Sequence, residues 1–231
     1  MKSRLTDRPT RPNPRPRPRA RRRGGPHKGV DSSATRTAVL NAAARSFSHR
    51  GFDGVGVDDI ARAAGVNKAM IYYHFKDKLA LYRHIVCDML REAGERVTAI
   101  ANAEAPADEK IHRFIEQFVA LTDDRPYFPT MMLREISEGA PHLDPDTLAL
   151  MRGVFTAFGR ILTEGQETGG FRAVHPVLAY MSILGPLLFN AARERAAAVP
   201  GRDHLPMFVP VSHADLTRHI QHVALRMLKK D

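Results

Sequence analysis

The sequence predicts an all-α protein in which a three-helix domain precedes a larger helical domain. Apolar residues recur at the spacing of one helix face through most of the chain, and no segment shows the alternating pattern of a β-strand. Proline and glycine interrupt these stretches at intervals of about one helix length. With 231 residues, 43% of them hydrophobic, the chain can bury a sizeable core.

Residues 1–33 are expected to form a basic, disordered tail ahead of the first helix. They hold eleven Lys or Arg and two Asp, a net charge of +9 out of the chain's +10. The segment also contains six prolines and few apolar residues. It therefore favours an extended chain and cannot bury enough apolar area to fold alone.

Three helices are expected between residues 35 and 74. The first covers about 35–50, with Gly51 ending it. The second and third are short and are joined by a tight turn at Gly65, where a residue without a Cβ can turn sharply. Asn67 is a good N-cap for the third helix, which runs from Lys68 to His74.

The third helix is basic and aromatic on its outer face, through Lys68, Tyr72, Tyr73 and His74. Two short helices in this layout are typical of a helix-turn-helix, whose second helix enters the DNA major groove. The alternative from these residues alone is an ordinary corner between two helices.

Further helices are expected in the rest of the chain. One starts near Asp77 and continues towards Ala99, and the segment 101–107 breaks the pattern. Helices then follow over about 108–122, 127–138, 144–166, 176–198 and 213–229.

Residues 35–86 resemble the DNA-binding domain of the TetR/AcrR family of bacterial transcriptional regulators. The match has no gap over about fifty residues and includes the segments Arg50-Gly51-Phe52, Asp59-Ile60-Ala61, Ala64-Gly65-Val66 and Tyr72-Tyr73-His74-Phe75, with Lys78. The resemblance implies a three-helix helix-turn-helix DNA-binding domain followed by a larger helical ligand-binding and dimerisation domain. The implied domains are the tail at 1–33, the helix-turn-helix domain at 34–80 and the effector and dimerisation domain at 81–231.

The resemblance also implies which residues contact DNA. They are Thr35, Arg36, Asn67, Lys68, Ala69, Met70, Tyr72, Tyr73, His74 and Lys78. Lys68 can donate to guanine, Ala69 and Met70 can touch thymine methyl groups, and Lys78 corresponds to a family lysine that binds phosphate. Members often carry hydroxyl residues where this chain has Val55 and Gly56, and Gly or Thr where it has Met70. Those departures leave the operator sequence open.

An apolar cavity for an effector is a second implication of the resemblance. Its expected lining is Met89, Phe114, Phe118, Met131, Met132, Phe155, Phe158 and Phe189, with His112, Arg134 and Glu135 as candidate polar anchors. Taken singly, each apolar residue fits an ordinary core better than a cavity wall, and a solvated face explains each polar residue equally well.

Two helices near the C-terminus carry apolar stripes that could form a four-helix bundle between two subunits. The expected interface is Leu178, Met181, Leu184, Leu188, Leu216, Ile220, Val223 and Met227. In many members of the family a hinge precedes these two helices, and residues 164–176 look like that hinge. A core within one subunit is the alternative explanation of the stripes.

Several other classes of site are disfavoured. No apolar run approaches the ~20 residues that cross a bilayer, and the single Cys87 excludes an intrachain disulfide framework. His219 and His222, with His213 or Asp215, lack the secure spacing of a metal site, and no catalytic constellation stands out. We therefore expect a cytoplasmic, nucleoid-associated protein that is not an enzyme and needs no cofactor or metal.

The preferred function is a homodimeric, ligand-released repressor of a near-palindromic operator. Its expected partners are a DNA duplex, a second copy of the chain and a small apolar or amphipathic effector, with no membrane. An effector-independent nucleoid-associated protein is the alternative. In the preferred function the tail at 1–33 is predicted to be an arm that strengthens DNA binding, and a solvated segment is the alternative.

Overall fold

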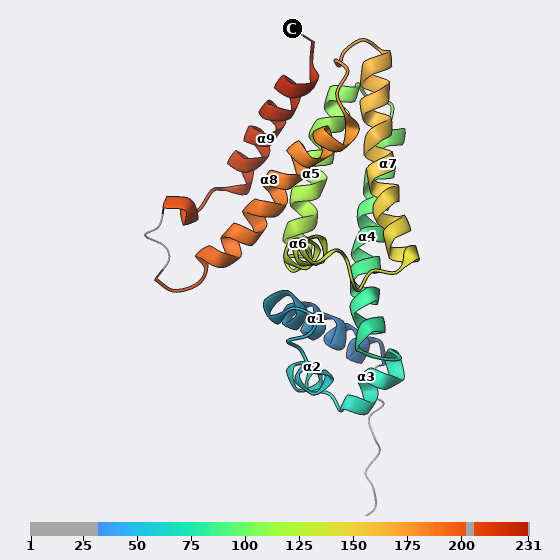
Figure 1. The fold of residues 1–231 in the computed structure, drawn as a ribbon, viewed down its shortest axis with the longest axis vertical. Coiled ribbons are helices and arrows are strands. Elements are labelled where there is room, and N and C mark those ends of the chain that lie inside the picture. Colours follow the sequence, from blue (N-terminus) through green and yellow to red (C-terminus); the bar gives the residue numbers. More distant parts are fainter. Residues whose placement is uncertain (1–31, 202–205, 231) are drawn as a thin grey trace, which may run out of the picture.

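The computed structural model describes residues 32–201 and 206–230, and these are almost entirely helical (Figure 1). The helices are α1 (Ser32–Arg50), α2 (Val57–Ala64), α3 (Lys68–His74), α4 (Lys78–Asn102), α5 (Ala107–Asp124), α6 (Phe128–Glu138), α7 (Pro145–Glu167), α8 (Pro176–Ala197) and α9 (His213–Leu228), with a 3-10 turn, η1, at Pro206–Phe208. Within the described residues there is no strand, only an isolated bridge between Phe171 and Lys229.

The all-α prediction is confirmed, and the helices lie close to their expected positions. The main differences are at helix ends. Helix α1 begins at Ser32 instead of Thr35, and α4 continues to Asn102. The added first turn of α1 holds only small or polar residues, whereas the added end of α4 includes Ile100, which packs into the core. The disordered tail was expected over residues 1–33, but Ser32 and Ser33 are helical in α1, and residues 1–31 lie outside the described residues.

One hydrophobic cluster holds α1, α2, α3 and the first half of α4 together. Its fully buried side chains include Val39, Phe47, Ile60, Ile71 and Leu81. Helix α6 also packs into this cluster, although it follows α5 in the chain. Figure 1 shows α6 directly above α1, between helices α1 to α3 and the rest of the molecule.

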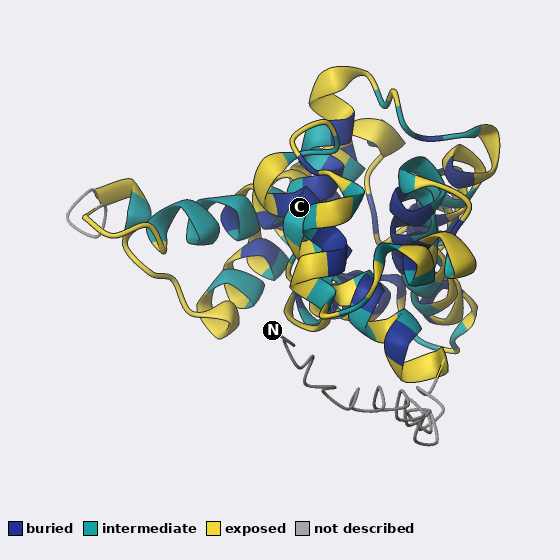
Figure 2. Cartoon of the chain, turned by 90° about the horizontal axis from the view of Figure 1, so that it is seen from below, coloured by how far each residue is buried: buried dark blue, intermediate teal, exposed yellow. Residues whose placement is uncertain are grey.

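A second cluster joins the end of α4 to α5, α7, α8 and α9. Ile111, Phe114, Phe158, Ile161 and Leu228 are fully or almost fully buried within it. Helix α4 packs along α7 and contributes to both clusters. The expected domain boundary at residue 80 lies near the start of this helix. Figure 2 shows buried residues where helices face one another and exposed residues on the outer faces.

The expected hinge at 164–176 is anchored to both neighbouring helices. Phe171 is 2% exposed and lies so close to Gly165 that an added Cβ would stand 2.1 Å from its ring. The Arg172 N–H donates to the Leu228 carbonyl oxygen at 2.8 Å. These contacts tie the end of α7 to the end of α9.

Candidate nucleic-acid interface and effector cavity

The turn between α2 and α3 has the geometry that the sequence predicts. Gly65 has φ +66°, in the left-handed region, and the Val66 N–H donates to the Ala61 carbonyl oxygen at 3.0 Å. The Asn67 side chain accepts a hydrogen bond from the Ala69 N–H at 2.9 Å, which caps α3. The first turn of α3 is thereby held at a fixed angle to α2.

Helix α2 is capped without the hydroxyl side chain that many family members use. Gly56 is the N-cap, and the Asp59 carboxylate accepts the Gly56 N–H at 3.3 Å. This hydrogen bond is the largest of the influences that lower the pKa of Asp59, ahead of the nearby Arg50 and Arg62. Asp59 thus supplies half of a capping box and stays ionised.

The outer face of α3 presents the expected DNA-contacting side chains. Ala69, Tyr72 and Tyr73 are exposed, with Tyr73 76% exposed. Lys68 is partly exposed, and its ammonium pairs with the Asp58 carboxylate at 2.8 Å, which raises the Lys68 pKa. Lys68 must give up this ion pair to reach a base.

Lys78 is already engaged with the loop between α1 and α2. Its Nζ donates to the carbonyl oxygens of Phe52 at 3.0 Å and Val55 at 3.2 Å, and it lies 4.0 Å from the centroid of the Phe52 ring. An ammonium has three N–H donors. One donor is thus left for a phosphate.

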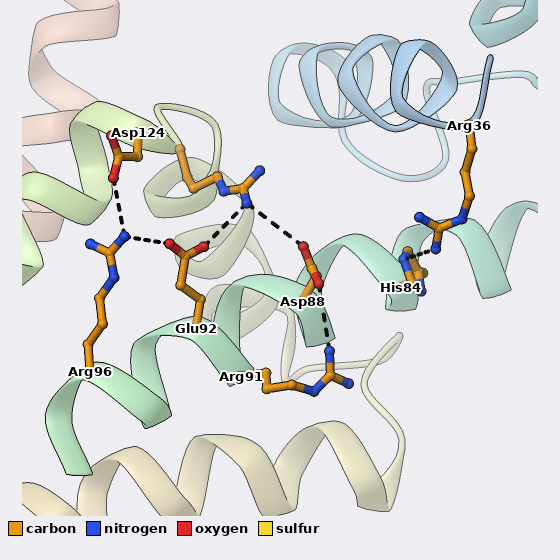
Figure 3. A network of polar contacts seen from close by, with 8 residues as sticks. Arg36, His84, Asp88, Arg91, Glu92, Arg96 and Asp124 are labelled. Atoms are coloured by element: carbon orange, nitrogen blue, oxygen red, sulfur yellow. Dashed lines mark hydrogen bonds and ion pairs between the residues drawn. The ribbon is translucent and has the colours of Figure 1, made fainter. Parts of the chain in front are cut away.

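The two expected DNA contacts on α1 differ in position, since Thr35 is buried while Arg36 lies beside Phe75 at the end of α3. Thr35 is 4% exposed, so its burial does not fit direct contact with DNA. The Arg36 guanidinium lies 2.5 Å from His84 Nε2 (Figure 3) and 5.4 Å from the Phe75 ring centroid.

His74, at the end of α3, has a buried Nε2 without a hydrogen-bond partner among the described residues.

A cavity of about 560 Å³ lies among α4, α5, α6, α7 and α8. Four of the expected lining residues meet there, namely Phe114, Phe118, Met132 and Phe155. The other four do not line it: Met89, Met131 and Phe158 are buried in the two clusters, and Phe189 is 60% exposed on α8. These four residues were expected in the cavity because they are Met or Phe, but the packing of their helices turns three of them into the core and exposes Phe189.

The cavity wall is almost entirely apolar. Apolar residues that were not expected in the wall also line it, among them Leu90, Val97, Leu121, Leu133, Ile136 and Met151. The polar or charged residues in the wall are Arg96, Gln117, Arg152 and Tyr180. Burial raises the pKa of the Tyr180 hydroxyl to about 12, so this group stays neutral.

The three candidate polar anchors are not in the cavity wall. Glu135 is 2% exposed, accepts a hydrogen bond from the Tyr82 hydroxyl at 2.7 Å and lies 2.8 Å from His142 Nδ1. Arg134 donates to the His49 carbonyl oxygen at 3.4 Å. His112 is partly buried on α5, where its carbonyl oxygen accepts from Gln221 at 3.5 Å.

An ionic network runs along α4 from the cavity wall towards α1 (Figure 3). Arg96, which lines the cavity, pairs with Glu92 at 2.5 Å and Asp124 at 3.3 Å. Arg125 pairs with Glu92 at 3.3 Å and with Asp88 at 3.9 Å. The network joins α4 to the loop between α5 and α6.

The expected dimer residues divide into exposed and packed sets. Leu178, Met181 and Val223 are exposed, at 64%, 62% and 41%. Leu184 and Ile220 are buried in the core of the subunit, and Leu216, Met227 and Leu188 are partly buried. Met181, Leu184 and Leu188 also line the cavity.

Phe189 belongs with the exposed set by its position on α8. It is eleven residues, about three turns, beyond Leu178, so these two side chains lie on nearly the same side of the helix. Figure 1 shows α8 and α9 side by side at one edge of the subunit. The exposed stripe therefore runs through Leu178, Met181 and Phe189.

Neither a membrane span nor a metal site is found in the part of the chain that the structure describes. No helix there is long and apolar enough to cross a membrane. Among the same residues, no group of His, Cys, Asp or Glu could hold a metal ion. His213 instead contacts Asp123 at 2.9 Å and Glu194 at 3.5 Å.

Comparisons with known proteins agree with this geometry. Residues 39–85 match the model of bacterial regulatory proteins of the tetR family, and residues 104–188 match the tetracyclin repressor-like C-terminal domain. Together these matches cover more than half of the chain.

Individual relatives are also transcriptional regulators. RutR of Escherichia coli (strain K12) is 26% identical over 144 residues, 62% of this chain and 68% of RutR. IcaR of Staphylococcus aureus (strain Newman), a negative transcriptional regulator of the biofilm operon icaADBC, is 26% identical over 87 residues, 38% of this chain and 47% of IcaR.

A solved relative shares the fold over most of its length. The TetR family regulator PfmR from Thermus thermophilus has a TM-score of 0.64 and 26% identity, covering 83% of this chain and 99% of PfmR. Regulators of this family bind DNA operators and dimerise. The chain therefore belongs to the TetR family and is a DNA-binding transcriptional regulator, not an enzyme.

Proposed function

We propose that this protein is a homodimeric repressor that leaves a near-palindromic operator when an apolar or amphipathic small molecule enters the cavity. The observation that carries the proposal is the position of α6. Met132, Leu133 and Ile136 on this helix line the cavity, while its other face packs into the cluster that contains α1. A ligand that displaces α6 would therefore act on the DNA-binding helices.

The polar contacts of α6 support this coupling. Glu135 accepts the Tyr82 hydroxyl of α4, and Arg134 donates to the last turn of α1. Tyr82 in turn lies against Phe52, with ring centroids 5.3 Å apart. Ligand can change operator affinity only through different affinities for two arrangements of these helices.

The composition of the cavity supports an effector with a hydrocarbon body. Phe114, Phe118 and Phe155 supply aromatic faces, and Met132 adapts to irregular ligand shapes. About 560 Å³ is in the usual range for a drug-sized ligand. The exposed stripe of Leu178, Met181 and Phe189 on α8 and Val223 on α9 supports the dimer interface.

A substitution that fills the cavity tests the effector role. A Cβ at Gly185, which lines the cavity, would meet no heavy atom within 4 Å, so the position accepts a side chain without a clash at its first atom. Because Gly185 is exposed one turn before Phe189 on α8, the oligomeric state of Gly185→Phe is measured first by sedimentation. Gly153→Phe is the matched control, because Gly153 also has free space but lies outside the cavity wall.

Operator binding would be followed by fluorescence anisotropy during titration with n-dodecanol and with dodecanoate. We expect release from the original protein and from Gly153→Phe, but not from Gly185→Phe, which should still bind the operator. Equal release from both variants would contradict a ligand site in this cavity. If neither probe releases the original protein, this effector class is contradicted while DNA binding stands.

A further inference from the structure

We propose that a second site, separate from the cavity, binds an oxyanion of the phosphate class at the junction of α1, α6 and α8. The site is formed by Arg45 of α1, Arg134 of α6 and Arg195 of α8, which we call the junction cluster. The proposal goes beyond the effector role proposed above, since it concerns a different ligand and a different surface.

Tyr127 brings two of the three arginines together. Arg45 Nε donates to the Tyr127 hydroxyl at 3.0 Å, and the Arg45 guanidinium carbon lies 6.0 Å from the ring centroid. The Arg195 guanidinium carbon lies 5.6 Å from the same centroid, and Arg195 donates to Thr130 Oγ1 at 3.3 Å. Side chains from α1 and α8 therefore meet at one aromatic ring.

Arg134 approaches from α6. It donates to the His49 carbonyl oxygen at 3.4 Å, and its Nη1 lies 2.9 Å from where a Cβ on Gly51 would stand. His49 is one turn beyond Arg45 on α1. The last turn of α1 thus faces guanidinium groups from both α6 and α8.

Within the described residues, none of the three arginines forms an ion pair with a carboxylate. Their hydrogen bonds go to a phenol, a hydroxyl and a backbone carbonyl, all of them neutral. Glu138, one turn along α6 from Arg134 and likewise described, forms no ion pair with it either. Each guanidinium has five N–H donors, so most of the donors remain available.

The local electrostatics indicate that positive charges crowd one another here. Partial burial lowers the pKa of His49, and the charges of Arg195 and Arg45 lower it further. Burial also lowers the pKa of Arg195, with a smaller contribution from Arg134. A ligand with two or more negative charges would relieve this repulsion.

Phosphate oxygens suit the donors of this cluster, because guanidinium groups bind planar pairs of oxygens through two parallel hydrogen bonds. DNA phosphates are not the expected occupant. Arg36 lies beside Phe75 at the end of α3, and Arg45 is nine residues further along α1, roughly 13 Å away along the helix. We therefore infer a small phosphate-bearing molecule.

A bound anion would tie α1 to α6 and α8. Helices α1 and α6 belong to the first hydrophobic cluster and α8 to the second, and α6 and α8 both contribute to the cavity wall. The anion would hold the two parts in one arrangement and so adjust operator affinity independently of the cavity ligand.

The first test uses pyrophosphate as the probe, with no DNA present. Isothermal titration of the full chain with sodium pyrophosphate, at constant ionic strength, should give saturable binding at one site per subunit. Arg45→Gln and Arg195→Gln should each weaken binding at least tenfold. Arg226→Gln is the matched control, since Arg226 is exposed on α9 and forms no ion pair among the described residues.

A second readout separates a binding role from a structural one. The ring protons of His49 would be followed by NMR against pH, with and without pyrophosphate. Binding should raise the pKa of His49, and Arg195→Gln should raise it without any ligand, because a nearby positive charge is removed.

Equal pyrophosphate binding by the original chain and by both variants would overturn the proposal. So would an unchanged His49 titration at saturating pyrophosphate. Neither result would alter operator binding or its release by a cavity ligand, so failure here is distinguishable from failure of the proposed function.

Discussion

The Lys78 ammonium donates to the carbonyl oxygen of Phe52 at 3.0 Å and lies 4.0 Å from the centroid of the Phe52 ring. The contact joins the first turn of α4 to the loop that enters α2. Since α4 continues along the cavity wall through Leu90, Ala93 and Val97, this lysine connects the helix that lines the cavity to the helix-turn-helix.

Lys78→Met should lower both stability and DNA affinity. Losing two hydrogen bonds from a charged donor should reduce the free energy of unfolding by about 2 kcal/mol. DNA binding should weaken similarly for all sequences, because the remaining ammonium N–H is expected to contact phosphate. Denaturant unfolding and anisotropy on operator and unrelated duplexes measure the two effects.

Lys76→Met is the control for this experiment. Lys76 is exposed two residues earlier and makes no hydrogen bond or ion pair with described residues. The free energy of unfolding of the Lys76→Met protein should therefore equal that of the original protein. If Lys78→Met is as stable as the control, the hydrogen bonds of Lys78 to the Phe52 and Val55 carbonyl oxygens contribute nothing to the stability of the fold.

Lys68 should read a base only after leaving Asp58, which it contacts at 2.8 Å. Lys68→Ala should reduce operator affinity roughly ten- to hundredfold and relax the preference at one base position in each half-site. Asp58→Asn should instead strengthen binding severalfold at low salt, because it frees Lys68 and removes a charge that repels phosphate. A loss from Lys68→Ala that is equal on operator and random DNA would argue against base readout.

Residues 1–33 are predicted to act as a DNA-binding arm that adds little sequence preference. They hold +9 of the net charge, and each phosphate they neutralise contributes about −0.9 to the slope of log affinity against log salt. If four basic side chains engage, a chain starting at Asp31 should show a slope flatter by about 3 to 4 units. Identical slopes for the two chains would leave the domain from Thr35 onward as the whole DNA reader.

His213 should make stability depend on pH. Partial burial lowers its pKa, but the hydrogen bonds and charges of Asp123 and Glu194 outweigh burial and raise the pKa above the ordinary 6.5. The protonated form is favoured by folding, so the stabilisation is complete below pH 6.5 and is lost as the pH rises through the folded-state pKa.

Thermal unfolding between pH 6 and pH 8.5 checks this titration. His213→Ala should flatten the fall in melting temperature across this interval, whereas His219→Ala, an exposed histidine on the same helix, should not. Parallel curves for the original chain and His213→Ala would contradict the assignment.

Gly165 should tolerate no side chain, because a Cβ there would stand 2.1 Å from Phe171. Gly165→Ala should lower the free energy of unfolding by about 1–3 kcal/mol through overpacking. Gly159→Ala, on the same helix with no atom within 4 Å of its Cβ, should instead stabilise by about 1 kcal/mol through helix propensity. Equal effects of the two substitutions, measured by denaturant unfolding, would mean that Phe171 moves aside freely.

The helices were predictable because local chemistry marks their ends. Gly65 adopts a left-handed conformation and Asn67 caps the next helix, and both signals depend on a few adjacent residues. The hydrogen bonds of Lys78 were not predictable in the same way. Their acceptors are backbone carbonyl oxygens of Phe52 and Val55, which leave no signature in the sequence.

The cavity was predictable in composition but only partly in position. Helix α8 is apolar on several sides, through Leu178, Met181, Leu184 and Phe189, so its sequence does not mark which side faces the core. Phe155 and Phe158 are close together on α7, yet only Phe155 reaches the cavity and Phe158 is buried in the core. Phenylalanine occurs both in the core and in the cavity wall, so the residue type alone does not distinguish the two positions. Tertiary packing decides between these roles.

A dimer of this chain is predicted to recognise one short operator through two α3 helices. Sequencing of DNA fragments selected by the purified full-length protein, followed by a footprint on the enriched site, tests this most directly. We predict a near-palindromic site whose half-sites lie about one helical turn apart or a multiple of it, with a short, discrete footprint and two chains per duplex. No enriched sequence and continuous protection along the DNA would contradict the claim and favour a protein that coats DNA.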